Sequence, residues 1–265
     1  MFASLKTATV SLFCSLVLLS GSVTAATVTT TETWDFKTNK SATNGNAIEI
    51  FSRELNNKLL MTGWTTQTSS NTAQIVAANN LVLTTSLGVQ IYNNHDKHGV
   101  DNIDGYDFIL LEFPSPTELI SLTNTWSNQP GYDWISVASL NTNPFSSKSL
   151  TWGQIASSSM VTASASYKHT GMNNEFIFAD KSPIISGTGI NNTTSKFWLI
   201  GAYNSAFNGG NCGTSCFGDS LKFGSITTKT TTTTPDPTPV PTPGTLSLFA
   251  VALLGLSLNK RRKAK

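Results

Sequence analysis

The sequence predicts an all-β protein, organised as a β-sandwich of the jelly-roll kind, with an N-terminal signal helix and a short C-terminal hydrophobic helix on either side. Short runs of β-branched and aromatic residues recur through the central part of the chain, separated by Gly, Asn and Pro. Long apolar patterns with the 3.6-residue period of a helix are absent there. Charged residues make up only 12% of the chain. This combination indicates many short strands joined by turns.

The expected strands share a high content of Val, Ile, Thr and aromatic residues. In chain order they are Val28–Phe36, Ala47–Phe51, Leu59–Trp64, Ala73–Ala77, Leu81–Thr85, Val89–Tyr92, Tyr106–Phe113, Leu119–Trp126, Trp134–Leu140, Glu175–Phe178, Phe197–Tyr203 and Ser220–Ile226. The strongest is Tyr106–Phe113, whose continuous apolar centre predicts burial on both faces of a sheet. A short helix is expected within Leu150–Tyr167.

Residues 1–25 have the layout of an export signal. Lys6 supplies the positive start, and the apolar stretch from Val10 to Leu19 is too short to span a membrane but has the length of a signal core. Val23 and Ala25 place small residues where a signal peptidase reads the chain, so we expect cleavage after Ala25. The alternative is a membrane anchor that stays uncut.

The C-terminal part combines a linker, an apolar run and a basic end. Alternating prolines from Pro235 to Pro243 favour an extended polyproline II conformation. Leu246–Leu258 is apolar and uncharged, but shorter than the roughly 20 residues of an ordinary spanning helix. The basic residues behind it are expected to stop the chain on the cytoplasmic side of the inner membrane. They are Lys260, Arg261, Arg262 and Lys263.

These features divide the chain into four parts. We expect a signal peptide over residues 1–25, an ectodomain over 26–226, a Thr/Pro-rich linker over 227–243 and a sorting or anchor segment over 244–265. A plain C-terminal tail anchor is the alternative for the last part.

The segment before the apolar run reads Val240, Pro241, Thr242, Pro243, Gly244 and Thr245. With the apolar helix and the basic end, it resembles the PEP-CTERM class of bacterial sorting signals. Thr242 stands where the usual pattern has Glu, so the motif is a variant, and the processing enzyme that reads it stays open. The resemblance implies recognition by an exosortase, a membrane cysteine transpeptidase, with cleavage near the Pro-Thr-Pro segment. It also implies export through the inner membrane of a Gram-negative bacterium to the cell surface or the exopolysaccharide matrix.

Further motifs lie inside the predicted ectodomain. His98-Gly99-Val100-Asp101-Asn102 precedes Asp107–Phe113, and Lys196–Tyr203 and Gly218–Phe223 follow later. These stretches resemble a family of exosortase-dependent surface proteins, although Lys97 stands where the family has Asn. The resemblance implies a β-rich ectodomain on the sorting tail. It brings no established enzymatic activity.

The charge of the central part argues against nucleic acid as a partner. Six of the 17 Lys and Arg residues lie in the terminal segments, which leaves 11 against 15 Asp and Glu in the rest of the chain. Nucleic-acid binding normally needs a basic face, and the central part has no Lys/Arg-rich stripe.

Oxygen-bearing side chains crowd one stretch of the chain. They are Asn93, Asn94, His95, Asp96, His98, Asp101, Asn102 and Asp104. Calcium takes six to eight oxygen ligands, so Asp101, Asp104 and Asp107 are candidate calcium ligands, although the spacing does not fit an EF-hand. The alternative is a solvated loop in which Asp and Asn bond their own backbone. No other cofactor is expected.

Cys212 and Cys216 are the cysteines left once Cys14 is removed with the signal. An oxidising compartment favours a disulfide between them, which would pin a Gly-rich loop rather than hold the fold.

Aromatic residues suggest a second kind of site. Trp152 and Tyr132 are flanked by Gly and polar residues, which makes them candidates for an exposed glycan-binding platform, whereas Trp198 is expected in the core. No nucleophile motif is present, and Glu112 and Glu175 are weak candidates for paired catalytic carboxylates. We therefore expect a structural or interaction protein of the cell surface or biofilm matrix. The alternatives are a surface-displayed carbohydrate-binding module and, last, a secreted hydrolase.

Overall fold

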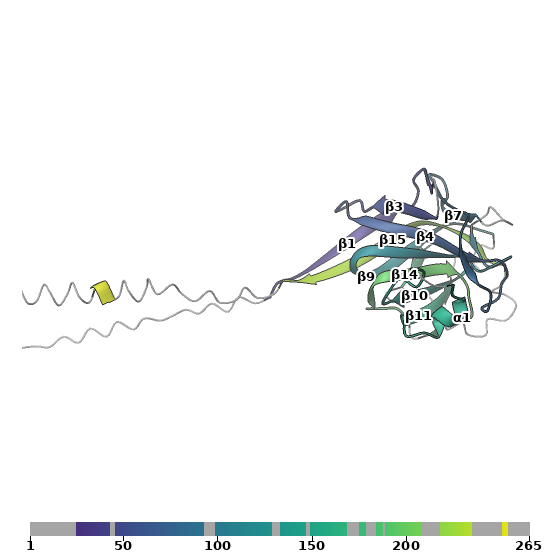
Figure 1. Ribbon diagram of the computed structural model, residues 1–265. Coiled ribbons are helices and arrows are strands. Elements are labelled where there is room, and N and C mark those ends of the chain that lie inside the picture. Colours follow the sequence, from purple (N-terminus) through teal and green to yellow (C-terminus); the bar gives the residue numbers. More distant parts are fainter. Residues whose placement is uncertain are drawn as a thin grey trace, which may run out of the picture. The chain divides into compact units, whose positions relative to one another are not determined.

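The computed structural model describes residues 25–42, 46–92, 99–128, 133–146, 149–168, 175–178, 184–187, 189–207, 218–234 and 251–253 (Figure 1). Thr29–Thr232 forms one compact unit, and Met1–Val28 with Thr233–Lys265 forms a second. The first unit is built of antiparallel strands, with one short helix among its described residues. The all-β prediction is confirmed.

Many of the strands were predicted from the sequence, and these lie close to their predicted positions. They are β1 (Thr27–Asp35), β2 (Lys40–Ser41), β3 (Ala47–Phe51), β4 (Lys58–Thr66), β5 (Ile75–Ala77), β6 (Asn80–Thr84), β7 (Gly88–Tyr92), β8 (Val100–Asp101), β9 (Phe108–Ser127), β10 (Trp134–Leu140), α1 (Trp152–Ala156), β11 (Val161–Lys168), β12 (Glu175–Ile177), β13 (Ile184–Gly187), β14 (Thr194–Ala202) and β15 (Ser220–Thr233).

The strands form two antiparallel sheets (Figure 1). The larger has 12 strands, and its main path runs β1-β15-β9-β14-β10-β11-β13. β4 and β12 also pair with β9, β3 and β5 pair with β4, and β8 pairs with the start of β15. The smaller sheet is β2-β6-β7.

β9 organises the larger sheet. Its first part, up to Glu112, pairs with β4 and β14, and its second part pairs with β12 and β15 and, at Thr117 and Glu118, still with β14. Pro114 and Pro116 lie between the two parts, where the register with β14 also shifts. Proline lacks the N–H that a ladder needs, so the change of partners falls where pairing is weakest. The two strands expected at Tyr106–Phe113 and Leu119–Trp126 are therefore one.

Both faces of the first part of β9 are covered. Ile109, Leu111 and Phe113 belong to the main hydrophobic cluster, which gathers side chains from both sheets. Phe108 and Leu110, on the opposite face, belong to a second cluster with α1 and Phe207. The burial predicted for this strand from its apolar run is confirmed.

The helix expected within Leu150–Tyr167 is much shorter than that range. α1 begins at a capping box in which Thr151 and Gln154 bond each other's backbone N–H groups, and it ends after Ala156. Val161–Lys168 is strand β11, because it pairs along β10 and buries Ala165 and Tyr167 in the main cluster. Small Ala and Ser residues carry little strand signal of their own, and tertiary pairing decides their conformation.

The Thr-rich segment placed in the linker also belongs to the folded unit up to Thr232. β15 continues through Thr227 and Thr228, which pair with Ser121 and Leu119 of β9. Thr228 is fully buried, and its Oγ1 accepts a hydrogen bond from Trp34 Nε1 at 3.1 Å. Thr is β-branched and suits a strand, so the boundary predicted at residue 226 was too early.

In the second unit, residues 251–253 are helical and exposed. Among the residues that the structure describes, no helix combines the length and hydropathy needed to cross a membrane.

Candidate functional site

The loop between β8 and β9 carries most of the acidic side chains singled out in the sequence. Asp101, Asn102 and Asp107 are buried, whereas Ile103 and Asp104 are exposed. The loop is closed by a hydrogen bond of 2.9 Å from Asp107 N to Asp101 O, and Asp101 Oδ1 accepts from Ile103 N at 3.1 Å. Because these hydrogen bonds fix the loop, its exposed residues Ile103 and Asp104 are held in defined positions.

Gly105 lets this loop approach β4. A Cβ at this position would lie 1.9 Å from the carbonyl oxygen of Thr66, which no side chain tolerates. The next residue, Tyr106, donates its backbone N–H to Thr66 Oγ1 at 2.9 Å. The loop is therefore held against the end of β4 by backbone contacts.

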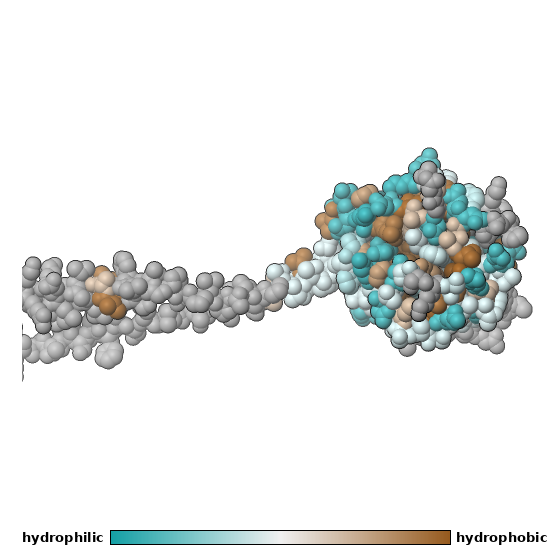
Figure 2. Space-filling model, viewed as in Figure 1, coloured by the Kyte–Doolittle hydropathy of each residue, from teal (hydrophilic) through white to brown (hydrophobic). Residues whose placement is uncertain are grey.

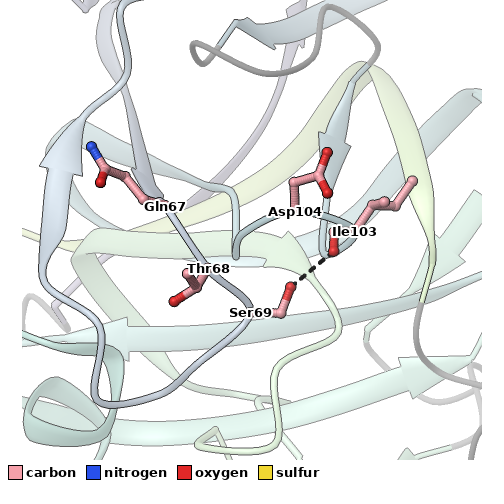
Figure 3. Close-up of a pocket in the computed structure, with 5 residues that line it drawn as sticks. All are labelled: Gln67, Thr68, Ser69, Ile103 and Asp104. Carbon is pink, nitrogen blue, oxygen red and sulfur yellow. Dashed lines mark hydrogen bonds between the residues drawn. The ribbon is translucent and has the colours of Figure 1, made fainter.

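A pocket opens on the outer side of the loop (Figure 3). Its volume is about 560 Å³, and Gln67, Thr68, Ser69, Ile103 and Asp104 line it. Ser69 Oγ lies 2.9 Å from the carbonyl oxygen of Asn102 and 3.1 Å from that of Ile103, which ties its two walls together. The lining offers an amide, hydroxyls and one carboxylate, which are groups that recognise polar ligands.

Asp101 and Asp107 form a buried acidic pair behind the pocket. Asp101 N donates to Asp107 Oδ2 at 3.4 Å, whereas Asp107 Oδ1 has no hydrogen-bond partner. Burial raises the pKa of Asp101 to about 6, and the nearby charge of Asp104 adds to the rise. Burial and the charge of Asp101 raise the pKa of Asp107 well above its usual range.

Asn102 links this loop to the start of β15. Its Oδ1 accepts from the backbone N–H groups of Gly218 at 2.8 Å and Asp219 at 2.9 Å. Its Nδ2 donates to the carbonyl oxygen of Tyr203 at 3.0 Å. Gly218 has φ +92°, a left-handed conformation that favours glycine, and it delivers Asp219 into the interior.

Asp219 lies completely buried beside Asp133, the residue before β10. Burial raises the pKa of Asp219 to about 8, with a further rise from the charge of Asp133. The backbone N–H of Trp134 is close enough to lower this pKa somewhat, but it makes no hydrogen bond of normal geometry, since neither Asp219 oxygen has a partner. Sequence reasoning did not single out Asp133 or Asp219, although the Gly218–Phe223 motif contains the latter.

The predicted calcium ligands are only partly brought together. Asp101 lies next to both Asp104 and Asp107, but Asp104 points outward into the pocket lining (Figure 3). In the described ranges, no group of three or more Asp, Glu, His or Cys side chains is arranged to hold a metal ion. The three do not form one site. Residues 93–98 of the same stretch lie outside the described residues.

Trp152 is fully buried, so the prediction that it is an exposed glycan platform was wrong. Its ring packs 4.5 Å from that of Phe108, measured between centroids, in the second hydrophobic cluster. The neighbouring Thr151 and Gln154 form the capping box of α1, and Gln154 is exposed. Trp198 is buried as expected, with its Nε1 donating to the carbonyl oxygens of Thr117 and Ser195, both at 3.1 Å.

The other tryptophans form no shared platform. Trp126 is 36% exposed, and Lys222 Nζ lies 4.6 Å from its ring centroid. Trp64 stacks on Phe145 with 3.8 Å between ring centroids. Figure 2 shows hydrophobic and hydrophilic areas intermixed on the visible face of the domain.

Several predicted site residues lie outside the described residues. They are Tyr132, the candidate disulfide pair Cys212 and Cys216, the sorting motif Val240–Thr245 and the basic end Lys260–Lys263. A scan against protein-family models, a search of curated proteins and a search of solved structures each gave no match.

Proposed function

We propose that this protein is exported and acts as a structural or interaction protein at the cell surface or in the extracellular matrix. In this proposal, signal peptidase removes residues 1–25, and an exosortase reads Val240–Thr245. The apolar run and the basic end hold the chain in the inner membrane until that step. Exopolysaccharide is the expected surrounding of the mature protein.

The observation that carries the proposal is the way the chain enters and leaves the folded unit. β1 and β15 are neighbouring strands, and beyond them Thr234 N donates to Ala26 O at 3.0 Å. Processing at both ends would therefore act on one edge of the domain and leave the loops elsewhere untouched. An anchored domain of this kind would display its pocket loops away from the attachment point.

The finer architecture that we infer is a β-sandwich of the jelly-roll kind. Its support is the main hydrophobic cluster, which takes residues from β6 and β7 of the smaller sheet as well as from the larger sheet. β9 pairs with β4 in its first part and with β15 in its second part. Such a change is expected for a strand that bends around the corner of a sandwich.

A catalytic role has weaker support. Glycoside hydrolysis needs two carboxyl groups on either side of the scissile bond, and the pocket lining includes one carboxylate, Asp104. Glu112, one of the two weak candidates, has its Oε1 3.4 Å from Lys196 Nζ. We therefore propose binding or structure rather than hydrolysis.

The test is the intact mass of the mature protein in producing cells, with and without the sorting enzyme. The expected chain begins near Ala26 and ends near Pro243, and the C-terminal trimming disappears without the enzyme. Replacing Pro241 and Pro243 by Ala should block trimming, whereas replacing Pro235 and Pro237 should not. A chain that keeps residues 244–265 in normal cells would show that the protein is a tail-anchored membrane protein instead.

Carbohydrate binding is the second candidate, favoured by the pocket beside the 101–107 loop. Side-chain amide, hydroxyl and carboxylate groups are the usual partners of sugar hydroxyls. Exopolysaccharide from the producing strain should bind the protein and lose affinity with Gln67→Ala or Asp104→Ala. Glu49→Ala, at an exposed position of strand β3 that is not part of the pocket lining, is the control. Equal binding by all three variants would remove this candidate.

A further inference from the structure

Three buried oxygen atoms without hydrogen-bond partners lie where β9, β10 and β15 meet. They are Asp219 Oδ1, Asp219 Oδ2 and Asn124 Oδ1. Both residues are at most 3% exposed. Buried polar atoms are almost always bonded, and a buried carboxylate without a donor is among the least favourable arrangements.

Asp133 brings a second carboxylate to the same place. Its Oδ2 accepts a hydrogen bond from Asn124 Nδ2 at 3.1 Å, and its Oδ1 accepts one from Ser127 Oγ. Because the Asn124 amide nitrogen touches Asp133, the unpartnered oxygen of the same amide lies beside the carboxylate pair. Asp219 forms no ion pair within the part of the chain that the structure describes.

The backbone around Asp219 is fixed independently of its side chain. Asn102 N donates to Asp219 O at 3.1 Å, and Asn128 brackets the neighbouring residues by donating to Gly218 O at 2.6 Å and accepting from Ser220 N at 2.9 Å. The Asp219 side chain is therefore held in the interior, although neither of its carboxylate oxygens accepts a hydrogen bond. Preorganised oxygen atoms of this kind are what a cation site requires.

We propose that Asp133 and Asp219, with the side-chain oxygen of Asn124, form a binding site for one calcium ion. Calcium prefers oxygen ligands, accepts an irregular set of six to eight of them, and uses water for the remainder. Magnesium demands a near-ideal octahedron, and transition metals favour nitrogen or sulfur, neither of which this site offers. Two carboxylates balance the charge of the ion.

This site is distinct from the calcium site that the sequence suggested at Asp101, Asp104 and Asp107. Its ligands precede or lie within β9, β10 and β15, so binding would tie three strands of the larger sheet together.

The test is isothermal titration of Ca²⁺ into the EDTA-treated mature protein purified from producing cells, together with its melting temperature. We expect one ion per chain and a melting temperature that rises with Ca²⁺. Asp219→Asn and Asp133→Asn should each weaken binding tenfold or more. Glu49→Gln, at an exposed acid of β3, should bind as the unchanged protein does.

Terbium luminescence on the unchanged protein gives a second readout that needs no variant. Trp134 follows Asp133 directly, so Tb³⁺ in this site should show emission sensitised by tryptophan, and Ca²⁺ should displace it. Absence of Ca²⁺ binding in the titration would overturn the proposal. Binding that survives both Asp133→Asn and Asp219→Asn would do the same.

Discussion

Asn102 and Asp219 hold each other through two hydrogen bonds that run in opposite directions. Asn102 N donates to Asp219 O at 3.1 Å, and Asp219 N donates to Asn102 Oδ1 at 2.9 Å. The same side chain also bonds Gly218 and Tyr203. One buried amide thus joins the 101–107 loop, the start of β15 and the end of β14.

Removing this amide should destabilise the domain strongly. Asn102→Ala removes three buried hydrogen bonds, those with Gly218 N, Asp219 N and Tyr203 O, for which we expect a loss of about 3 kcal/mol or more in the free energy of unfolding. The matched control is Asn141→Ala, because Asn141 is exposed and its side chain makes one bond, to Ser159 O. Urea unfolding should show a control loss of about 0.5 kcal/mol or less. Equal losses in the two variants would contradict the role given to Asn102.

The strands of the core could be predicted from the sequence because their residues repeat a simple pattern. Ala47–Phe51 and Trp134–Leu140 were located to the residue, since apolar and β-branched side chains mark both. β11 was missed because Thr162-Ala163-Ser164-Ala165-Ser166 has small side chains without a strand pattern, and pairing with β10 decides its form. Long-range pairing of this kind cannot be read from a local window.

The two fully buried tryptophans should respond differently to replacement by Phe. Trp198 Nε1 has two carbonyl acceptors, whereas Trp152 Nε1 has none. Trp198→Phe should therefore cost about 1–2 kcal/mol more than Trp152→Phe, although both leave a similar cavity. Urea unfolding followed by circular dichroism measures both. A larger loss for Trp152→Phe would show that its ring nitrogen has a partner after all.

Trp152→Ala should act on stability rather than on a ligand. The side chain is packed against Phe108 and Phe207, so we expect a loss of about 3–5 kcal/mol. Any change in glycan binding should follow the unfolded fraction, and binding measured below the unfolding transition should stay the same. Selective loss of binding in a folded Trp152→Ala variant would return this residue to the candidate site.

The C-terminal end of β15 should contribute measurably to the thermal stability of the domain. A chain of residues 26–226 lacks Thr228, whose hydroxyl accepts from Trp34 Nε1, and leaves the edge strand β1 without the last part of its neighbour. We expect it to melt at a lower temperature than a chain of residues 26–234, since the loss leaves buried Trp34 without its acceptor. Equal melting temperatures would place the domain boundary at Ile226, as the sequence suggested.

Gly88 should tolerate no side chain. Its φ is +80°, and a Cβ would lie 2.0 Å from the carbonyl oxygen of Phe223. Gly88→Ala adds strain and a clash with backbone, so we expect a loss of about 3 kcal/mol or more. Asn56→Ala is the comparison, because Asn56 is exposed with φ 55° and should lose about 1 kcal/mol from strain alone. Similar losses at the two positions would exclude the clash.

The candidate site was predictable only where acidic residues are adjacent in sequence. Asp101, Asp104 and Asp107 fall within one loop, so their proximity could be anticipated. Asp133 and Asp219 are far apart along the chain, and each is a single Asp before a strand, a common turn residue. Asp133 and Asp219 come together only because β9 pairs with β15 and because β10 starts at the same place. No local sequence pattern encodes this long-range arrangement.

The buried carboxyl groups should make stability fall as pH rises. A folded-state pKa above the unfolded value means that the folded chain binds more protons, so stability is greatest below the unfolded value and is lost as pH rises through the folded one. For Asp101 and Asp219 the loss extends from their ordinary value of 3.8 to about 6 and about 8, and Asp107 acts in the same direction. In EDTA, urea unfolding should show a loss on the order of a few kcal/mol across this range.

Asp219→Asn isolates the contribution of the Asp219 carboxyl group to the loss of stability with rising pH. The amide cannot ionise, so the variant should lose less stability than the unchanged protein between about pH 6 and pH 8, where Asp101 is already largely ionised and Asp219 still titrates. Glu49→Gln, at an exposed position of strand β3, should keep the full slope. Calcium should oppose the loss in the unchanged protein, because it binds the ionised carboxylate, and should have no such effect in Asp219→Asn. A slope that Asp219→Asn leaves unaltered would mean that this carboxyl group is not the source of the pH dependence, and that another buried acid, Asp107 first, carries it.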